Sequence, residues 1–433
     1  MDMSELTKIP KYESYMNSEF EWIGDIPEEW ELTKLGSCLF PISIKNCSEL
    51  KLLSITREQG VIERNLEDQD SNHNFIPDDL SGYKKIEKGQ FGMNKMKAWQ
   101  GSYGVSKYTG IVSPAYFVFN FTKTINTEFF NWAIRSKLYV SYFGSASDGV
   151  RIGQWDLSKV RMKNIPFLLP PEREQIAIAN FLEQKTAQIN EAIAIKEKQI
   201  ELLKERKQII IQEAVTRGLN PNVPMKDSGV DWIGEIPEHW GVKRLKYVLA
   251  ERNERSRTGE EPLFMVSQVH GLVVRADYHE KAEVAASNVD NKIVYRNDLV
   301  FNKLKAHLGV FFKSNIEYEG LVSPDYAVYQ CKAYIRDAKY LELLFRHPSY
   351  IEQFIIRATG IVEGLIRLYT GDLFDISVPV PPSKEQHEIL EYIKKQIQIY
   401  NSAVALQQSQ IIKLKEYKTT LINSAVTGKI KVP

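Results

Sequence analysis

Two short segments of this 433-residue chain alternate lysine with an aromatic residue. That pattern suits contact with the phosphates and bases of nucleic acid. The six residues are Lys95, Lys97, Trp99, Lys303, Lys305 and His307. Further positive charge comes from Lys107 and Arg151 after the first trio and from Arg357 and Arg367 after the second. We predict that all of these residues bind DNA; the alternative is a solvated loop with ordinary lysines.

The sequence contains few patterns that are typical of catalytic or metal sites. It has no GxxxxGK phosphate loop, and no glycine-rich dinucleotide turn follows a strand. The histidines have neither HxxxH nor HExxH spacing, so we predict no metal site. The three cysteines form no CxxC pair, which favours free thiols in a reducing cytoplasm.

Two near-matches to enzyme motifs need a decision. Ser113–Tyr116 and Ser323–Tyr326 faintly resemble the Asn/Asp-Pro-Pro-Tyr/Phe loop of amino-methyltransferases, but both lack its second proline. We interpret them as turns that enter strands. Asp325, together with Asp337–Lys339, fits the loose PD…(D/E)xK nuclease pattern, but alanine stands at the related position of the first segment. We therefore predict that the chain is not an enzyme by itself.

The bulk composition is that of an ordinary globular protein, with 43% hydrophobic and 26% charged residues. A net charge of +1 argues against a purely electrostatic nucleic-acid binder, so DNA contact would need local clusters of lysine and arginine. No apolar run reaches the roughly 18 residues of a membrane helix, and the N-terminus does not resemble a signal peptide. We expect a cytoplasmic protein of two or three domains.

The two basic segments belong to a unit that occurs twice. The run WIGDIPEEW begins at Trp22 and returns as WIGEIPEHW at Trp232. The run PPEREQ begins at Pro170 and returns as PPSKEQ at Pro381. Because the order of the repeated runs is kept, one domain has been duplicated. Two copies in one chain suggest a task with two similar halves.

Each copy divides into a globular part and a long helix. The globular parts mix short strand-like runs with helical stretches at 127–139 and 339–345, and turn residues separate them, which predicts an α+β domain. The predicted strands are 115–119, 165–169, 327–329 and 376–380. The predicted parts are an N-terminal segment (1–21), a first globular domain (22–169), a central long helix (170–217), a linker (218–228), a second globular domain (229–380), and a distal long helix with the C-terminal tail (381–433).

The long helices have clear start and stop signals. No glycine or proline interrupts the chain from Pro171 to Gly218, or from Pro382 to Gly428. Apolar residues recur at heptad spacing along both segments, which predicts a coiled coil. The predicted seam residues are Leu182, Ile189, Ile193, Ile200, Leu203, Ile210, Ile393, Tyr400, Val404, Ile411, Leu414 and Leu421. The alternative is an amphipathic helix that packs on its own domain.

The short linker predicts how the two helices are related. Only about a dozen residues separate the end of the first helix from the second domain, and a compact domain often returns its chain near its point of entry. The second helix can then pair with the first only by running antiparallel. We expect two similar domains separated by a coiled coil and related by a pseudo-twofold axis, the arrangement of a caliper.

Together these features resemble the specificity subunit of type I restriction-modification systems. The resemblance covers essentially the whole chain, and its most telling segments are the WIGDIPEEW and WIGEIPEHW runs and the PPEREQ and PPSKEQ helix starts. The helix ends at Glu213–Gly218 and Ser424–Gly428 add to it. The resemblance implies that each globular domain (22–169 and 229–380) is a target recognition domain, which reads one half of a bipartite, asymmetric DNA target. It also implies that the helices set the spacer between the halves.

The same resemblance implies partners and cofactors. The helices would dock two modification subunits, which methylate adenine with AdoMet. Separate restriction subunits would use ATP and Mg²⁺ to translocate and cleave DNA, whereas the chain itself would hold no cofactor. The expected location is the cytoplasm of a bacterium or archaeon.

Four alternatives remain open from the sequence. The chain could serve another type of restriction-methylation enzyme, or be an orphan spare copy. It could be a catalytic methyltransferase or nuclease, against which the absence of an AdoMet-binding motif argues. It could also be a coiled-coil scaffold that binds only protein.

Overall fold

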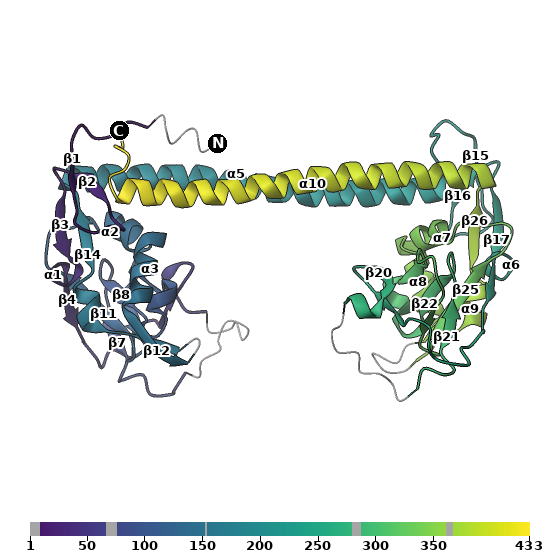
Figure 1. The fold of residues 1–433 in the computed structure, drawn as a ribbon, viewed down its shortest axis with the longest axis horizontal. Coiled ribbons are helices and arrows are strands. Elements are labelled where there is room, and N and C mark those ends of the chain that lie inside the picture. Colours follow the sequence, from purple (N-terminus) through teal and green to yellow (C-terminus); the bar gives the residue numbers. More distant parts are fainter. Residues whose placement is uncertain (1–8, 66–75, 152–153, 279–286, 361–366) are drawn as a thin grey trace. The chain divides into compact units, whose positions relative to one another are not determined.

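The computed structural model describes residues 9–65, 76–151, 154–278, 287–360 and 367–433, without the side chains of 150–154, 306 and 307. The chain forms two compact units (Figure 1). Unit 1 comprises Met1–Lys198 and Gln407–Pro433, and unit 2 comprises Gln199–Leu406. Each unit contains one mixed domain and half of each long helix. We call the globular parts domain 1 and domain 2.

The centre of domain 1 is a four-stranded antiparallel sheet with the strand order β4-β11-β8-β9. Phe91 in β8 stacks on Phe119 in β11 and meets Phe130 of α2 edge-on, with ring centroids 5.9 and 5.2 Å away. Glycine is required at position 92 because the side chain of Ile86 in β7 packs against it. A Cβ atom there would lie 2.7 Å from the Ile86 side chain. The elements are β1 (Tyr15–Asn17), β2 (Asp25–Pro27), β3 (Glu31–Lys34), α1 (Leu35–Cys38), β4 (Leu39–Ile42), β5 (Leu53–Thr56), β6 (Gly60–Glu63), β7 (Lys84–Ile86), β8 (Phe91–Met93), η2 (Ala98–Gln100), β9 (Tyr103–Val105), β10 (Gly110–Val112), β11 (Phe117–Phe121), α2 (Thr127–Ile134), α3 (Lys137–Ser145), β12 (Ser147–Arg151), β13 (Gln154–Leu157), α4 (Lys159–Lys163) and β14 (Pro166–Leu169).

Domain 2 repeats this plan, with a central sheet of order β18-β25-β22-β23. Leu299, Val300 and Phe301 of β22 are all buried, because apolar layers cover this inner strand on both faces. The elements are β15 (Met225–Asp227), β16 (Glu235–Pro237), β17 (Gly241–Arg244), α6 (Leu245–Val248), β18 (Leu249–Glu251), β19 (Phe264–Ser267), β20 (Gly271–Val274), η3 (Arg275–Asp277), β21 (Lys292–Val294), β22 (Leu299–Asn302), η4 (Lys303–Leu308), β23 (Phe311–Lys313), β24 (Gly320–Val322), β25 (Tyr326–Cys331), α7 (Ala338–Leu344), α8 (Pro348–Arg357), α9 (Thr370–Phe374) and β26 (Ser377–Val380).

The repeated motifs connect each domain to the start of a long helix. The indole Nε1 of Trp30 donates to Glu174 Oε2 at 2.9 Å, and Trp240 Nε1 donates to Glu385 Oε2 at the same distance. Both tryptophans are buried, so each indole needs an acceptor. The conserved order of these motifs in the two copies therefore preserves a structural joint rather than a catalytic group.

The long helices are α5 (Glu172–Arg217) and α10 (Ser383–Val426), and they pair within each unit. The cross-helix hydrogen bonds include Asn190–Lys418 (2.8 Å) and Lys196–Gln407 (3.2 Å) in unit 1 and Lys207–Asn401 (3.0 Å) in unit 2. In unit 1 the partner's number falls as the number along α5 rises, so the helices run antiparallel. The fold is the predicted one of two similar α+β domains joined by long paired helices.

The side chains at the predicted seam positions turn inward to different extents. The buried ones are Leu182, Ile189, Ile193, Ile200, Ile393, Ile411, Leu414 and Leu421. The half-buried ones are Leu203, Ile210, Tyr400 and Val404. Several apolar residues on other faces of the two helices stay exposed, among them Leu202, Ile399 and Leu406.

One predicted helix is wrong in its extent. The segment 127–139 contains two helices, α2 and the start of α3, because the backbone of Ser136 is extended (φ −63°, ψ 152°). Serine favours this position just before a helix. The predicted helix at 339–345 corresponds to α7, and the predicted strands lie within two residues of β11, β14, β25 and β26.

Candidate nucleic-acid interface

The repeated Asn-Lys-x-Lys-Ala segments form the same turn in both domains. The side-chain oxygen of Asn94 accepts a hydrogen bond from the Met96 amide at 3.2 Å, and Asn302 accepts one from Leu304 at 3.0 Å. Such side-chain-to-backbone bonds stabilise tight turns, which accounts for the recurring asparagine. The second lysines of the two segments, Lys97 and Lys305, have nearly the same φ (−124° and −123°), and both are exposed.

A second element joins this turn in each domain. The Leu157 amide of β13 donates to the Lys95 carbonyl at 3.2 Å, and the Leu368 amide donates to the Lys303 carbonyl at 3.1 Å. In domain 1 the second element is the strand pair β12–β13; in domain 2 its described equivalent is the bridge between Thr359 and Arg367. We call the turn and this element together the hairpin surface (94–97 with 147–151 and 154–157; 302–305 with 359–360 and 367–368).

Four lysines gather beside the hairpin surface of domain 1. Lys84 Nζ donates to the Tyr116 carbonyl at 2.6 Å, and the ammonium groups of Lys84 and Lys159 lie 6.0 and 4.4 Å from the centroid of the Phe117 ring. Burial lowers the pKa of Lys84, and the positive charges of Lys159, Lys45 and Lys95 lower that pKa further. This local concentration of charge is what a chain of nearly zero net charge needs in order to bind a polyanion.

Domain 2 has a cation cluster at the equivalent place. Lys292 pairs with Val322 as Lys84 pairs with Val112, so the two lysines correspond. Burial lowers the pKa of Lys292, and the charges of Lys303 and Arg255 lower it further, whereas Glu251 opposes this effect. The Glu251 carboxylate lies 3.7 Å from the ammonium nitrogens of both Lys292 and Lys303. The second cluster is therefore partly neutralised.

The cation clusters correspond position by position. The Lys85 amide donates to the Ile44 carbonyl, and the Ile293 amide donates to the Glu254 carbonyl. Ile44 precedes Lys45 in the sequence, and Glu254 precedes Arg255. The corresponding pairs are Lys45 and Arg255, Lys84 and Lys292, and Lys95 and Lys303. Sequence reasoning identified only the last pair, because the other two come from segments remote in the chain that the sheet brings together.

The residues predicted to bind DNA differ in their surroundings. Lys97, Lys107 and Lys305 are exposed. Three others form ion pairs: Lys95 with Asp156 (3.0 Å), Lys303 with Glu251 (3.7 Å) and Arg367 with Asp325 (3.2 Å). Arg357 donates a hydrogen bond to the Gln353 carbonyl at the end of α8. Arg151 lies in β12 and His307 in η4, and their side chains are outside the described part of the chain. In domain 1 the hairpin contacts Lys95 through Asp156 and Leu157, and it contacts Trp99 through Trp155. No described contact joins Arg357 to Lys303 or Lys305.

An aromatic pair joins η2 to the hairpin surface of domain 1. The rings of Trp99 and Trp155 have centroids 5.2 Å apart, and Trp155 is 36% exposed. The buried indole nitrogen of Trp99 has no hydrogen-bond partner among the described residues. Sequence reasoning missed Trp155, although its hairpin carries a signal: Gly149 and Gly153 recur as Gly360 and Gly364 at the same separation.

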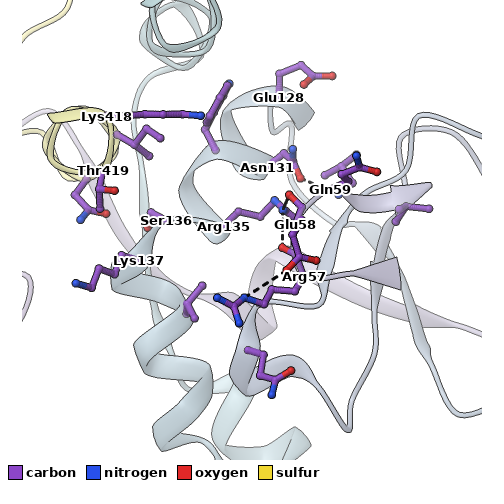
Figure 2. Close-up of a pocket in the computed structure, with 18 of the residues that line it drawn as sticks. Arg57, Glu58, Gln59, Glu128, Asn131, Arg135, Ser136, Lys137, Lys418 and Thr419 are labelled. Atoms are coloured by element: carbon purple, nitrogen blue, oxygen red, sulfur yellow. Dashed lines mark hydrogen bonds and ion pairs between the residues drawn. The ribbon is translucent and has the colours of Figure 1, made fainter. Parts of the chain in front are cut away.

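A cavity whose lining includes Trp99 and Lys107 has a structural role (Figure 2). It measures about 910 Å³ and lies in unit 1 between domain 1 and α10. The Arg135 guanidinium donates to the backbone carbonyls of Tyr103, Arg57 and Glu58, which holds the turn between β5 and β6. The lining also includes Lys418 and other groups of both charges, so it does not form a uniform anion site.

The enzyme-like motifs are engaged elsewhere. Asp325 pairs with Arg367, and Asp337 caps α7 while it accepts from Lys313 Nζ at 2.8 Å. Ser323 forms a turn, since its carbonyl accepts from the Tyr326 amide at 3.0 Å. Among the described residues, no three histidine, cysteine or acidic side chains are grouped so that they could hold a metal ion. Nor does any helix in the described ranges have the length and apolar character needed to cross a membrane.

Comparison with known proteins gives consistent relatives, although no family model matches the chain. The MjaVIII specificity subunit of a type I restriction enzyme from Methanocaldococcus jannaschii is 24% identical over 311 residues, which cover 68% of this chain and 69% of that protein. The EcoKI specificity subunit from Escherichia coli is 25% identical over 285 residues, covering 63% and 59%. The EcoDI specificity subunit is 22% identical over 403 residues, covering 86% and 82%.

Two solved structures share the fold. A structure described as the basis of complex assembly and conformational transition of the type I R-M system aligns with a TM-score of 0.65 at 15% identity, over 93% of this chain and 98% of that one. The HsdS subunit from Thermoanaerobacter tengcongensis aligns with a TM-score of 0.58 at 15% identity, over 96% and 100%.

The duplicated fold and the relatives define a DNA-specificity protein of a restriction system, which is not itself an enzyme. The chain resembles the specificity subunits of type I restriction enzymes in sequence, and it shares their fold.

Proposed function

We propose that domain 1 and domain 2 each bind one half of a bipartite DNA sequence, with the hairpin surface and its cation cluster toward the DNA. The observation that carries this proposal is the recurrence of three basic positions at equivalent places in the two domains. Lysine and arginine that neutralise phosphates supply most of the sequence-independent affinity of DNA-binding proteins. The turns and hairpins beside them differ between the domains, so the two half-sites should differ and the target should be asymmetric.

The paired helices would fix the gap between the half-sites. DNA presents the same face about every 10.5 base pairs, so two reading domains need a defined separation. Paired helices hold a separation more tightly than a flexible linker does.

The helices would also bind two modification subunits, which carry AdoMet. Leu202, Ile399 and Leu406 in unit 2 are 52, 52 and 59% exposed, and a partner that covers them would remove apolar surface from water. Restriction subunits that use ATP and Mg²⁺ would complete the complex in the cytoplasm.

Mapping of N6-methyladenine tests the proposal. The chain is coexpressed with the modification subunit encoded beside it in a host that lacks adenine methylation, and methylated sites are located by single-molecule sequencing. We expect one asymmetric motif of two parts with a fixed gap. A stable complex that methylates no site, or a motif without two parts, would contradict the proposal.

Exchange of one domain sharpens the test. Residues 32–164 are replaced by the corresponding part of another specificity subunit, and domain 2 is left intact. One half of the motif should change while the other half and the gap stay the same. A change in both halves would show that the domains do not read independently.

A further inference from the structure

One position of the hairpin surface carries opposite charge in the two domains. Asp156 immediately precedes Leu157, and Arg367 immediately precedes Leu368. The two leucine amides make the same backbone hydrogen bond, to the carbonyl oxygens of Lys95 and Lys303, at 3.2 and 3.1 Å. The backbone therefore presents residues 156 and 367 at equivalent places. A carboxylate stands at this place in domain 1 and a guanidinium in domain 2.

Each of these side chains is oriented by an ion pair and keeps further hydrogen-bonding atoms available. Asp156 Oδ2 lies 3.0 Å from Lys95 Nζ, and the side chain of Asp156 is 59% exposed. Arg367 Nη2 lies 3.2 Å from Asp325 Oδ1. Asp156 Oδ1 and the Arg367 Nη1 and Nε groups make no hydrogen bond within the described part of the chain. Exposed ion pairs of this kind contribute little to folding, so the fold does not depend on either charge.

The two groups recognise different base edges. In the major groove a carboxylate accepts a hydrogen bond from the amino group of cytosine, whereas arginine donates two hydrogen bonds to guanine. Lys95 pairs with Asp156, and the Lys303 carbonyl accepts from the residue that follows Arg367. The cation clusters to which these lysines belong would hold the adjacent phosphates, which fixes the register of the side chains over the bases. Trp155 precedes Asp156 in the sequence and packs against Trp99, which adds an apolar group to the hairpin surface of domain 1.

We propose that Asp156 and Arg367 are specificity-determining residues, with Asp156 selecting a cytosine in the half-site of domain 1 and Arg367 selecting a guanine in the half-site of domain 2. The inference rests on the proposed function, in which each domain binds one half of the target. It adds which residue distinguishes the bases and which base each residue prefers.

The test uses the full chain in complex with its modification subunit and maps methylated sites for three variants. Asp156→Asn should weaken the preference for cytosine and admit adenine at one position, since an amide pairs with adenine. Asp156→Arg should reduce methylation of the original site roughly 5- to 150-fold, the discrimination of one good side-chain–base contact. Arg367→Gln should relax one guanine in the other half. In each case the opposite half of the motif should stay unchanged.

A matched control separates base reading from the loss of a surface ion pair. Glu31 pairs with Lys123 at the far end of β11, and the side-chain exposures of 54 and 33% are close to those of Asp156 and Lys95, 59 and 32%. Glu31→Gln should leave the motif and the methylation rate as they are. Thermal unfolding of every variant complex checks that the fold is retained.

The outcomes distinguish this inference from the function on which it rests. A wild-type complex that gives no two-part motif would contradict the proposed function. A wild-type two-part motif that Asp156→Asn and Asp156→Arg both leave unchanged would overturn the inference alone. So would a uniform loss of methylation in Asp156→Asn without any change in base preference.

Discussion

Domain 1 and domain 2 share one framework but neutralise their basic clusters differently. Glu251 lies beside Lys292 and Lys303 in domain 2. Phe119 of β11 and Tyr329 of β25 occupy equivalent places in the two central sheets. Pro41 pairs with Phe119 and Glu251 pairs with Tyr329, so Pro41 stands at the place of Glu251 in domain 1. The cluster of domain 1 therefore has no carboxylate at this place, and its nearest described acidic partner is Asp156 on the hairpin.

This difference shows which features of the duplicated unit stayed fixed. The joint between the tryptophan and the glutamate at the helix start is the same in both copies, since a buried indole requires an acceptor. The charges around the clusters differ between the copies, because the carboxylate of Glu251 has a proline at the corresponding place in domain 1. On the proposed function, we expect this difference to change the DNA affinity of the two domains.

The largest expected effect concerns the shared joint. Trp30→Ala and Trp240→Ala should each lower the free energy of unfolding of their unit by about 3–5 kcal/mol, because each removes a fully buried aromatic side chain. Calorimetry of the full chain measures the loss. Phe40→Ala is the control, since Phe40 is 59% exposed and its loss should change stability by less than about 0.5 kcal/mol. A large loss for only one tryptophan would break the equivalence of the two domains.

The seam of the paired helices should respond unequally at two equivalent positions. Leu414 is 5% exposed, whereas Leu203 at the related position is half-buried. Leu414→Ala should therefore cost about 2–5 kcal/mol, and Leu203→Ala should cost less. Chemical denaturation followed by helical circular dichroism measures both. Losses near zero for the two variants would show that the helices do not pair through these residues.

The cation clusters should differ in their contribution to DNA binding. Lys84→Gln should weaken binding of every DNA sequence and reduce the slope of log affinity against log salt by about 0.9, as expected when one phosphate contact is lost. Lys292→Gln should reduce the slope less, because Glu251 already offsets part of the positive charge. Titrations of the complex at several salt concentrations test this. Equal slopes for both variants would contradict the unequal neutralisation.

The smallest expected effect involves the cysteines. Burial raises the pKa of Cys38 to about 11 and that of Cys331 to about 12, from an ordinary value of 9.0. Alkylation at pH 8 should therefore label Cys47 first, the half-buried Cys331 more slowly, and the buried Cys38 only after denaturation. The unfolded chain releases these thiol protons at lower pH than the folded chain does. The contribution of the two protonated thiols to the free energy of unfolding is therefore complete below pH 9 and is lost as the pH rises toward 12. Rapid labelling of Cys38 in the native chain would show that domain 1 is open at α1.

The sequence predicted the duplication, the α+β domains and the antiparallel helices, because these depend on local signals. Pro171 and Gly218 bound an uninterrupted heptad pattern, and apolar periodicity alone indicates such a helix. The break between α2 and α3 was missed, since no glycine or proline marks Ser136, the extended residue that precedes α3.

The candidate interface was predicted only in part, for a physical reason. Lys95 and Lys303 lie in a repeated motif, so sequence comparison finds them, but whether each charge is free depends on distant partners. Asp156 and Glu251 come from remote segments that only the sheets and hairpins bring within reach.

The sequence by itself therefore determined the plan of this protein, because heptads, caps and repeated motifs can be read from the order of residues along the chain. The tertiary structure alone decided which lysines form a cluster, which of them a carboxylate neutralises, and that Asp156 and Arg367 occupy equivalent places. Those properties depend on distances between residues far apart in the chain, and electrostatic interaction depends on such distances and on burial.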